Sequence, residues 1–173
     1  MQLNIHPIFV HFPIALLTVY ALVELVRTKT ALRSTSIKVL KGFLVTTGTI
    51  GAFVAMQTGE LAEKTIGGAP SQLIETHSLF ANMTFYVFLV LALIYLLELM
   101  DILPIGQKIR QTKMRAGFEK ILGYAQKIIH TPFMPTFALI GLILVTITGA
   151  LGGAIVYGAD IDPVVHFIYS LFF

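Results

Sequence analysis

Four long apolar segments constrain the fold of this chain more than any other feature. They cover approximately residues 8–26, 39–57, 78–100 and 134–157, and each is close to the ~20 residues that cross the hydrocarbon core of a bilayer as a helix. Lipid offers no hydrogen bonds to the backbone, so spanning segments of this length are expected to be helical. The sequence therefore predicts an all-α, integral membrane four-helix bundle that forms one domain over residues 1–173.

Composition supports a membrane protein and excludes several functional classes. Charged residues make up 12% of the chain, about half the share found in soluble domains. The chain has no cysteine, which excludes disulfides, thiolate zinc sites, iron–sulfur clusters and covalent c-type haem. It also lacks the GxSxG, HExxH and P-loop motifs of common hydrolases and nucleotide-binding enzymes. The first segment has no basic residue ahead of it, so we expect it to stay in the mature protein rather than act as a signal peptide.

The charges predict the orientation of the bundle. Basic residues cluster in the first connection (Arg27, Lys29, Arg33, Lys38 and Lys41) and in the third (Lys108, Arg110, Lys113, Arg115, Lys120 and Lys127), and only Lys64 lies elsewhere. The positive-inside rule places both basic connections in the cytoplasm, with the N- and C-termini outside. The second connection is acidic (Glu60, Glu63 and Glu75), as is the tail (Asp160 and Asp162). Because the basic residues are divided between two connections at the membrane surface, no nucleic-acid partner is expected.

Two shorter elements are expected outside the spans. Residues 107–129 carry an apolar stripe opposite a basic face, which is typical of an amphipathic helix lying at the inner, anionic interface. At the other side, Asp162 is a favourable N-cap and Pro163 a favourable first-turn residue. The sequence PVVHFIYSLFF that begins at Pro163 therefore predicts a short outer helix.

Histidines gather on the predicted outer side. Four of the five histidines fall there: His6 and His11 at the start of the first span, His77 at the start of the third, and His166 in the terminal helix. Only His130 falls on the inner side, where we interpret it as an interfacial turn residue. Glu60 ends the second span on the same outer side. In an antiparallel bundle the first and third spans lie on a diagonal, so His11 and His77 are expected to face each other.

The individual histidines also have a simpler interpretation, because histidine is common near membrane interfaces. His6 precedes Pro7, which favours an extended conformation at His6. His11 lies inside the span ahead of Pro13, and ionisable residues within spans usually face the protein interior. Thr76 is a plausible N-cap for a helix that opens with His77. We favour a shared role for the histidines over independent surface roles.

Two kinds of cofactor suit this set of residues. Haem b requires one or two axial histidines on facing helices and an apolar slot; His11 and His77 are the expected ligands, with His6 and His166 as alternates. Glycines in the second and fourth spans allow close packing of helices or room for such a planar group. Alternatively, copper, zinc or non-haem iron would use three or four ligands from the same histidines and Glu60.

The segment HPIFVHFP (residues 6–13) resembles the hallmark of a bacterial membrane family, domain of unknown function 2231. That family is typified by an HPxxVHFP start, four spans, a Thr-Gly pair near the end of the second span and a His opening the third. TGE (58–60), HSLFAN (77–82) and TGALGGAIVYG (148–158) extend the resemblance across all four spans. Here GADIDP follows Tyr157 and the third connection is expanded, in departure from the family pattern. The resemblance implies a bacterial inner-membrane location, and relatives joined to cytochrome c-like domains imply redox surroundings.

These observations together favour a membrane b-type haem protein that transfers electrons near the outer leaflet, between a quinol and a periplasmic redox partner. Glu60 is the candidate proton carrier. The alternatives are a non-haem metal-binding membrane protein and an accessory structural subunit that packs in a larger membrane complex or a homo-oligomer.

Overall fold

The chain is helical throughout the described parts of the computed structural model, which are residues 6–63 and 70–173. The helices are α1 (His6–Leu25), α2 (Lys29–Arg33), α3 (Thr35–Glu63), α4 (Ser71–Ile102), α5 (Pro104–Arg110), α6 (Arg115–Ile129), α7 (Phe133–Tyr157) and α8 (Pro163–Ser170). Helices α1, α3, α4 and α7 are long and apolar enough to cross a membrane, which confirms the predicted all-α, four-span class. Lys64, named above in the second connection, lies outside the described residues.

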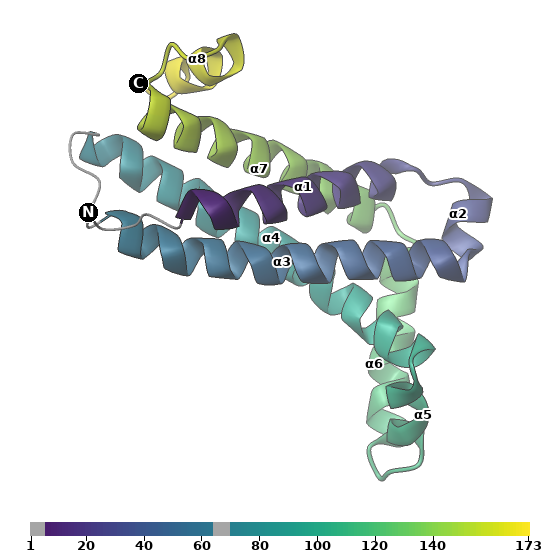
Figure 1. Ribbon diagram of the computed structural model, residues 1–173. Coiled ribbons are helices and arrows are strands. Elements are labelled where there is room, and N and C mark those ends of the chain that lie inside the picture. Colours follow the sequence, from purple (N-terminus) through teal and green to yellow (C-terminus); the bar gives the residue numbers. More distant parts are fainter. Residues whose placement is uncertain (1–5, 64–69) are drawn as a thin grey trace.

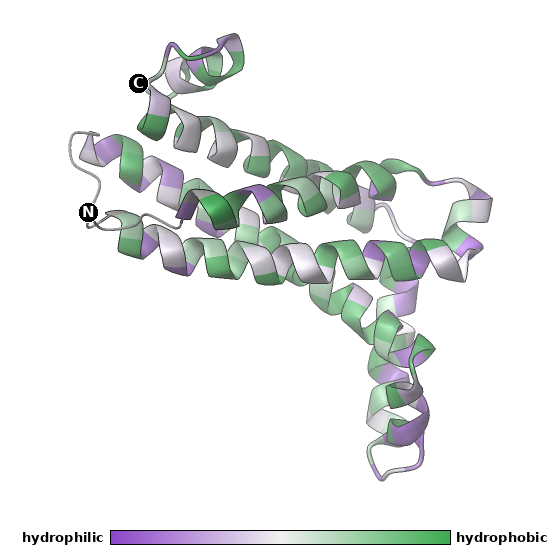
Figure 2. Cartoon of the chain, viewed as in Figure 1, coloured by the Kyte–Doolittle hydropathy of each residue, from purple (hydrophilic) through white to green (hydrophobic). Residues whose placement is uncertain are grey.

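The four long helices form a bundle in which α1 and α4 occupy one diagonal. α1 packs against α3 and α7, and α4 packs against the same two helices (Figure 1). The expected diagonal placement of the first and third spans is therefore confirmed. We call the end where α1 and α4 begin the histidine end, and the opposite end, which carries α2, α5 and α6, the basic end. Figure 2 shows hydrophobic residues along the bundle and hydrophilic residues concentrated on the α5–α6 projection.

The amphipathic helix expected over residues 107–129 is divided in two. α5 ends at Arg110, residues 111–114 form a turn, and α6 begins at Arg115. The Thr112 hydroxyl oxygen accepts a hydrogen bond from the backbone N–H of Met114 at 3.2 Å, so a local side-chain contact stabilises the turn against helix continuation. Arg110 pairs with Asp101 and lies over the Phe118 ring, which holds the two helices together beside the end of α4.

The short terminal helix follows the prediction from its capping residues. Asp162 Oδ1 accepts hydrogen bonds from the backbone N–H groups of Val164 and Val165 at 2.8 and 2.9 Å, as an N-cap side chain does. Val165 and Ile168 are buried in a cluster with α4 and α7. α8 therefore packs at the histidine end of the bundle.

The centre of the bundle is a tightly packed apolar core. Tyr20, Phe88 and Tyr95 are almost fully buried, and the Tyr20 ring meets both other rings edge to face, at centroid distances of 6.1 Å and 5.9 Å. Phe88 lies directly on Gly141 of α7, where a Cβ atom would come within 2.6 Å of the ring atom Cζ. A side chain at Gly141 would therefore force a buried aromatic ring to move.

This contact predicts different effects for two glycines of the same helix. Gly141→Ala should destabilise the bundle by about 1–3 kcal/mol, because overpacking displaces a ring that has no free space around it. Gly149→Ala is the matched control, since a Cβ there meets nothing within 4 Å. The midpoint of thermal unfolding in detergent micelles measures both. Equal midpoints for the two variants would contradict this account of the core.

Candidate functional site

His6 and His77 both belong to the inward-facing sides of the diagonal helices at the histidine end. On α1, His6 shares a side with the buried residues Leu17, Tyr20 and Glu24. On α4, His77 continues the buried series that includes Leu73, Thr84, Phe88 and Glu98. The fold therefore brings one histidine from each half of the chain to the same end of the bundle interior.

His6 is held by α3. Its Nδ1 lies 3.0 Å from the hydroxyl oxygen of Thr58, and its ring covers Gly59, where a Cβ would come within 3.2 Å of Cε1. Burial lowers the pKa of His6 below its ordinary value, against a smaller opposite effect from a hydrogen bond to the backbone of Ala55. The neutral imidazole, which is the form that binds metals, is thereby favoured.

His77 is held by α7 in a closely similar way. Its Nδ1 lies 3.0 Å from the backbone carbonyl oxygen of Thr148, and its ring covers Gly152, where a Cβ would come within 3.2 Å of Cε1. The Thr148 hydroxyl also contacts that of Thr84 on α4 at 3.1 Å. Each half of the bundle thus repeats one arrangement, in which a histidine in the first two turns of one long helix contacts a threonine and covers a glycine of the next long helix.

The partners of the two rings differ in hydrogen-bonding chemistry. His6 Nδ1 contacts the Thr58 hydroxyl, which also donates to the carbonyl of Ala55 at 2.9 Å. His77 Nδ1 contacts the Thr148 carbonyl, which is an acceptor only, so His77 Nδ1–H is the donor and in the neutral ring the lone pair lies on Nε2. Histidines that bind metals are oriented in this manner, with one nitrogen hydrogen-bonded to the protein and the other directed at the ion.

His11 does not face His77, in contrast to the expectation from the sequence. Its side chain is exposed on the outside of the bundle. Five residues separate it from His6, which is a rotation of about 140° around the helix axis. The proline that follows two residues later does not alter this, because α1 continues through Pro13 to Leu25. Ionisable residues within spans usually face the protein interior, but the prediction that the His11 side chain does so is wrong.

The other predicted residues lie near the histidine end without joining the pair. His166 is exposed on α8, and its Nδ1 lies 2.8 Å from the Asp160 carboxylate. Glu60 is exposed on α3, directly after Gly59. His77 lies seven residues into its helix, because α4 begins at Ser71 and not after Thr76. Among residues 6–63 and 70–173, no group of three or more His, Cys, Asp or Glu side chains is placed to hold a metal ion.

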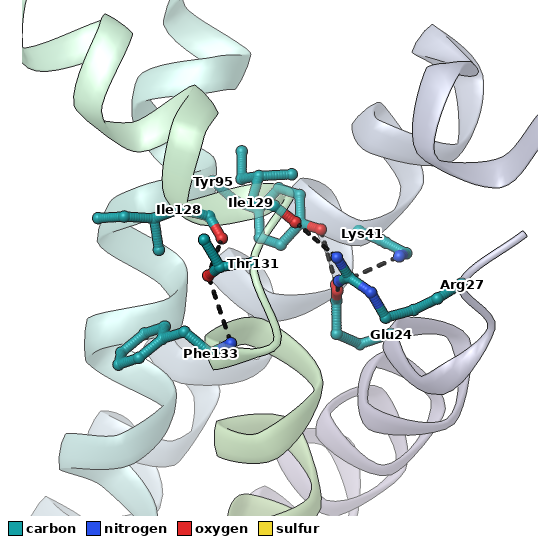
Figure 3. A network of polar contacts seen from close by, with 8 residues as sticks. All are labelled: Glu24, Arg27, Lys41, Tyr95, Ile128, Ile129, Thr131 and Phe133. Atoms are coloured by element: carbon teal, nitrogen blue, oxygen red, sulfur yellow. Dashed lines mark hydrogen bonds and ion pairs between the residues drawn. The ribbon is translucent and has the colours of Figure 1, made fainter. Parts of the chain in front are cut away.

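A buried network of charges at the basic end was not anticipated from the sequence. Glu24 on α1 is fully buried and pairs with Lys41 on α3 at 3.3 Å and with Arg27 at 3.2 Å. Tyr95 on α4 donates its hydroxyl hydrogen to Glu24 Oε2 at 2.6 Å, and Arg27 donates to the carbonyl of Ile129 at 3.2 Å (Figure 3). One carboxylate thereby joins α1, α3, α4 and the end of α6.

A second ion pair lies beside the first. Glu98 on α4 is buried, receives a hydrogen bond from Lys38 on α3 at 2.6 Å, and accepts another from Gln126 on α6 at 3.2 Å. Lys38 and Lys41 stand about one helical turn apart, so α3 holds a carboxylate from each of the two diagonal helices. The sequence analysis missed this network, although a signal was present in Tyr-x-x-x-Glu at 20–24 and Tyr-x-x-Glu at 95–98, each at the end of an apolar run.

Residues 2–163 match the family described as "Predicted membrane protein (DUF2231)". The chain belongs to this family. The matched range of the DUF2231 family includes His6, His77 and all four long helices. Neither the curated proteins nor the solved structures yield a match to this chain.

The network at the basic end predicts a large effect of removing one buried cation. Lys41→Met should destabilise the protein by about 3 kcal/mol, because the buried carboxylate of Glu24 loses part of its compensation. The double variant Glu24→Gln/Lys41→Met should recover part of that loss, since no buried carboxylate is then left without its lysine. Thermal unfolding midpoints in detergent measure both, with Lys127→Met, at an exposed position of α6, as the control. A Lys41→Met midpoint equal to that of the control would contradict a stabilising role.

Proposed function

We propose that this protein binds haem b at the histidine end, with His6 and His77 as the axial ligands, and that it functions in electron transfer. The observation that carries the proposal is the pair of inward-facing histidines on diagonal helices. Each has Nδ1 3.0 Å from an oxygen of the neighbouring long helix, which fixes the orientation of its ring. Two imidazoles from facing helices are a common ligand set for b-type haem in helical bundles.

The surroundings of the two rings are small and apolar. Gly59 and Gly152 lie against the imidazoles, where any side chain would push the rings out of place. The cluster beside His77 is apolar, with Leu73, Leu151 and Ala154 buried from α4 and α7. These features supply the apolar setting and fixed ring orientation that haem ligation requires.

When bound, haem supplies an iron that accepts and releases one electron. Thr58 and Thr148 orient the imidazoles by accepting their Nδ1–H hydrogens, and a stronger hydrogen bond there makes the opposite nitrogen a stronger donor. Glu60, exposed beside the site, carries the proton that accompanies an electron. In this proposal His6 takes the place of His11 as a ligand, because the His11 side chain is exposed on the far side of α1 from His6.

The proposal also includes an orientation of the bundle in the membrane, an electron donor and an electron acceptor. The positive-inside rule supports a cytoplasmic basic end, because Arg27, Lys29, Arg33 and the basic α5–α6 region lie there. The histidine end would then face the periplasm of a bacterium, with the protein in the inner membrane. A quinol in the bilayer is the electron donor and a periplasmic redox protein the acceptor.

Haem content of single variants tests the ligand assignment. Purified wild-type protein should show a reduced-minus-oxidised visible spectrum of haem b. His6→Ala and His77→Ala should each lose most of the bound haem, because one axial bond and one anchored ring are removed. His11→Ala is the matched control on the same helix and should retain it.

Three outcomes would contradict the assignment. A protein without any haem spectrum after expression with ample haem contradicts the function itself. Haem lost in His11→Ala but kept in His6→Ala would restore the pairing of His11 with His77. Stoichiometric copper, zinc or iron by elemental analysis without a porphyrin spectrum would favour the second candidate, a non-haem metal protein that uses the same imidazoles.

Single cysteines test the orientation, since the natural chain has none. Ser71→Cys and Asp160→Cys at the histidine end should react with a membrane-impermeant maleimide in intact spheroplasts, whereas Lys113→Cys should react only after lysis. All three positions are exposed. The reverse pattern would show that the basic end faces the periplasm.

A further inference from the structure

An apolar groove runs between α1 and α3 on the outside of the bundle. It has a volume of about 460 Å³ and is lined by Ile8, Phe9 and Phe12 from α1 and by Thr47, Ile50, Gly51 and Val54 from α3. Gly51 adds no side chain to the floor of the groove. A Cβ atom at this position would come within 3.3 Å of the Phe12 ring. Both walls belong to segments long and apolar enough to span a membrane.

The place of the groove limits what can fill it. Its lining residues Ile8, Phe12 and Ile50 are exposed on the surface of the spanning region, and that surface is continuous with the lipid-facing surface of both helices. Any occupant must therefore come from the bilayer. An apolar groove among lipid-facing residues selects a hydrocarbon or isoprenoid molecule and excludes a charged solute.

The groove also adjoins the proposed cofactor site. Phe9 follows His6 by three residues on α1, and Val54 precedes Thr58 by four residues on α3, so each is about one turn from a member of the His6–Thr58 hydrogen bond. Two phenyl rings, from Phe9 and Phe12, line the α1 wall. Aromatic side chains favour a flat ring through stacked or edge-to-face contacts, whereas an acyl chain gains nothing specific from them.

We propose that the α1–α3 groove binds an isoprenoid quinone, with its ring between the α1 phenylalanines and Gly51 and its chain along the lipid-facing surface. Thr47 supplies a hydroxyl to the lining. This proposal rests on the proposed function, for which it locates the membrane-soluble substrate. It commits to binding, and it needs no haem in the protein for its test.

Photolabelling identifies the occupant directly. The full chain is placed in nanodiscs and irradiated with a photoactivatable short-chain ubiquinone or menaquinone analogue, and in parallel with a photoactivatable phospholipid. Mass spectrometry of the peptides should show quinone label within residues 8–12 and 47–54, and excess unmodified quinone should abolish it. Label confined to other helices, or phospholipid label in the groove that quinone does not displace, would overturn the proposal.

A matched pair of variants tests the groove itself. Ile50→Trp fills the space and should lower quinone labelling about tenfold, the change produced by roughly 1.4 kcal/mol of lost binding free energy. Phe43→Trp, seven residues earlier on the same exposed side of α3 and outside the lining, should label as wild type. Equal labelling of Ile50→Trp and Phe43→Trp would overturn the proposal. Quinone labelling of a protein that proves to contain no haem would support this site and contradict the haem assignment alone.

Discussion

Two buried ion pairs at the basic end join three of the four long helices. Lys41 and Lys38 of α3 hold Glu24 of α1 and Glu98 of α4, so one helix fixes both members of the diagonal pair. Charges this deeply buried are costly unless they are paired and hydrogen-bonded. The pairing therefore strongly favours one rotation of α1 and of α4 about the helix axis and one position of each along that axis. The same rotation turns His6 and His77 inward at the opposite end.

The bundle is built from two similar halves. In each, the first long helix carries an inward histidine near one end and an inward glutamate near the other, and the second long helix supplies the threonine and glycine that fix the histidine. One histidine from each half thus lies at the same end of the bundle, on helices that occupy a diagonal. A cofactor that takes one ligand from each half would bridge them, which is the physical basis of the proposed haem site.

Much of the fold was accessible from the sequence because a bilayer restricts it so strongly. Length and apolarity predicted the four spans, and antiparallel packing predicted the diagonal of α1 and α4. The capping chemistry of Asp162 predicted α8. The division between α5 and α6 was not predicted, because the apolar stripe continues across the turn at residues 111–114 and conceals it.

The orientation of the histidines was harder to predict, since it depends on helical phase. His6 precedes Glu24 by 18 residues, which is about five full turns, so the two share a side. His11 was favoured because of its depth and the nearby Pro13, but depth says nothing about the side of a helix. Had Glu24 been recognised as an inward anchor, its phase would have selected His6. The hydrogen bonds to Thr58 and Thr148 required the three-dimensional structure, because they join helices far apart in the chain.

In the proposed site, one imidazole from α1 and one from α4 would hold a single haem iron. Electron paramagnetic resonance of the oxidised, haem-loaded protein tests this pairing, because the ligand field of the iron depends on the groups that bind it. A single low-spin signal of the kind given by two histidine ligands is the expected result. A high-spin signal would show that one of the two imidazoles is not bound and would rule out the paired site.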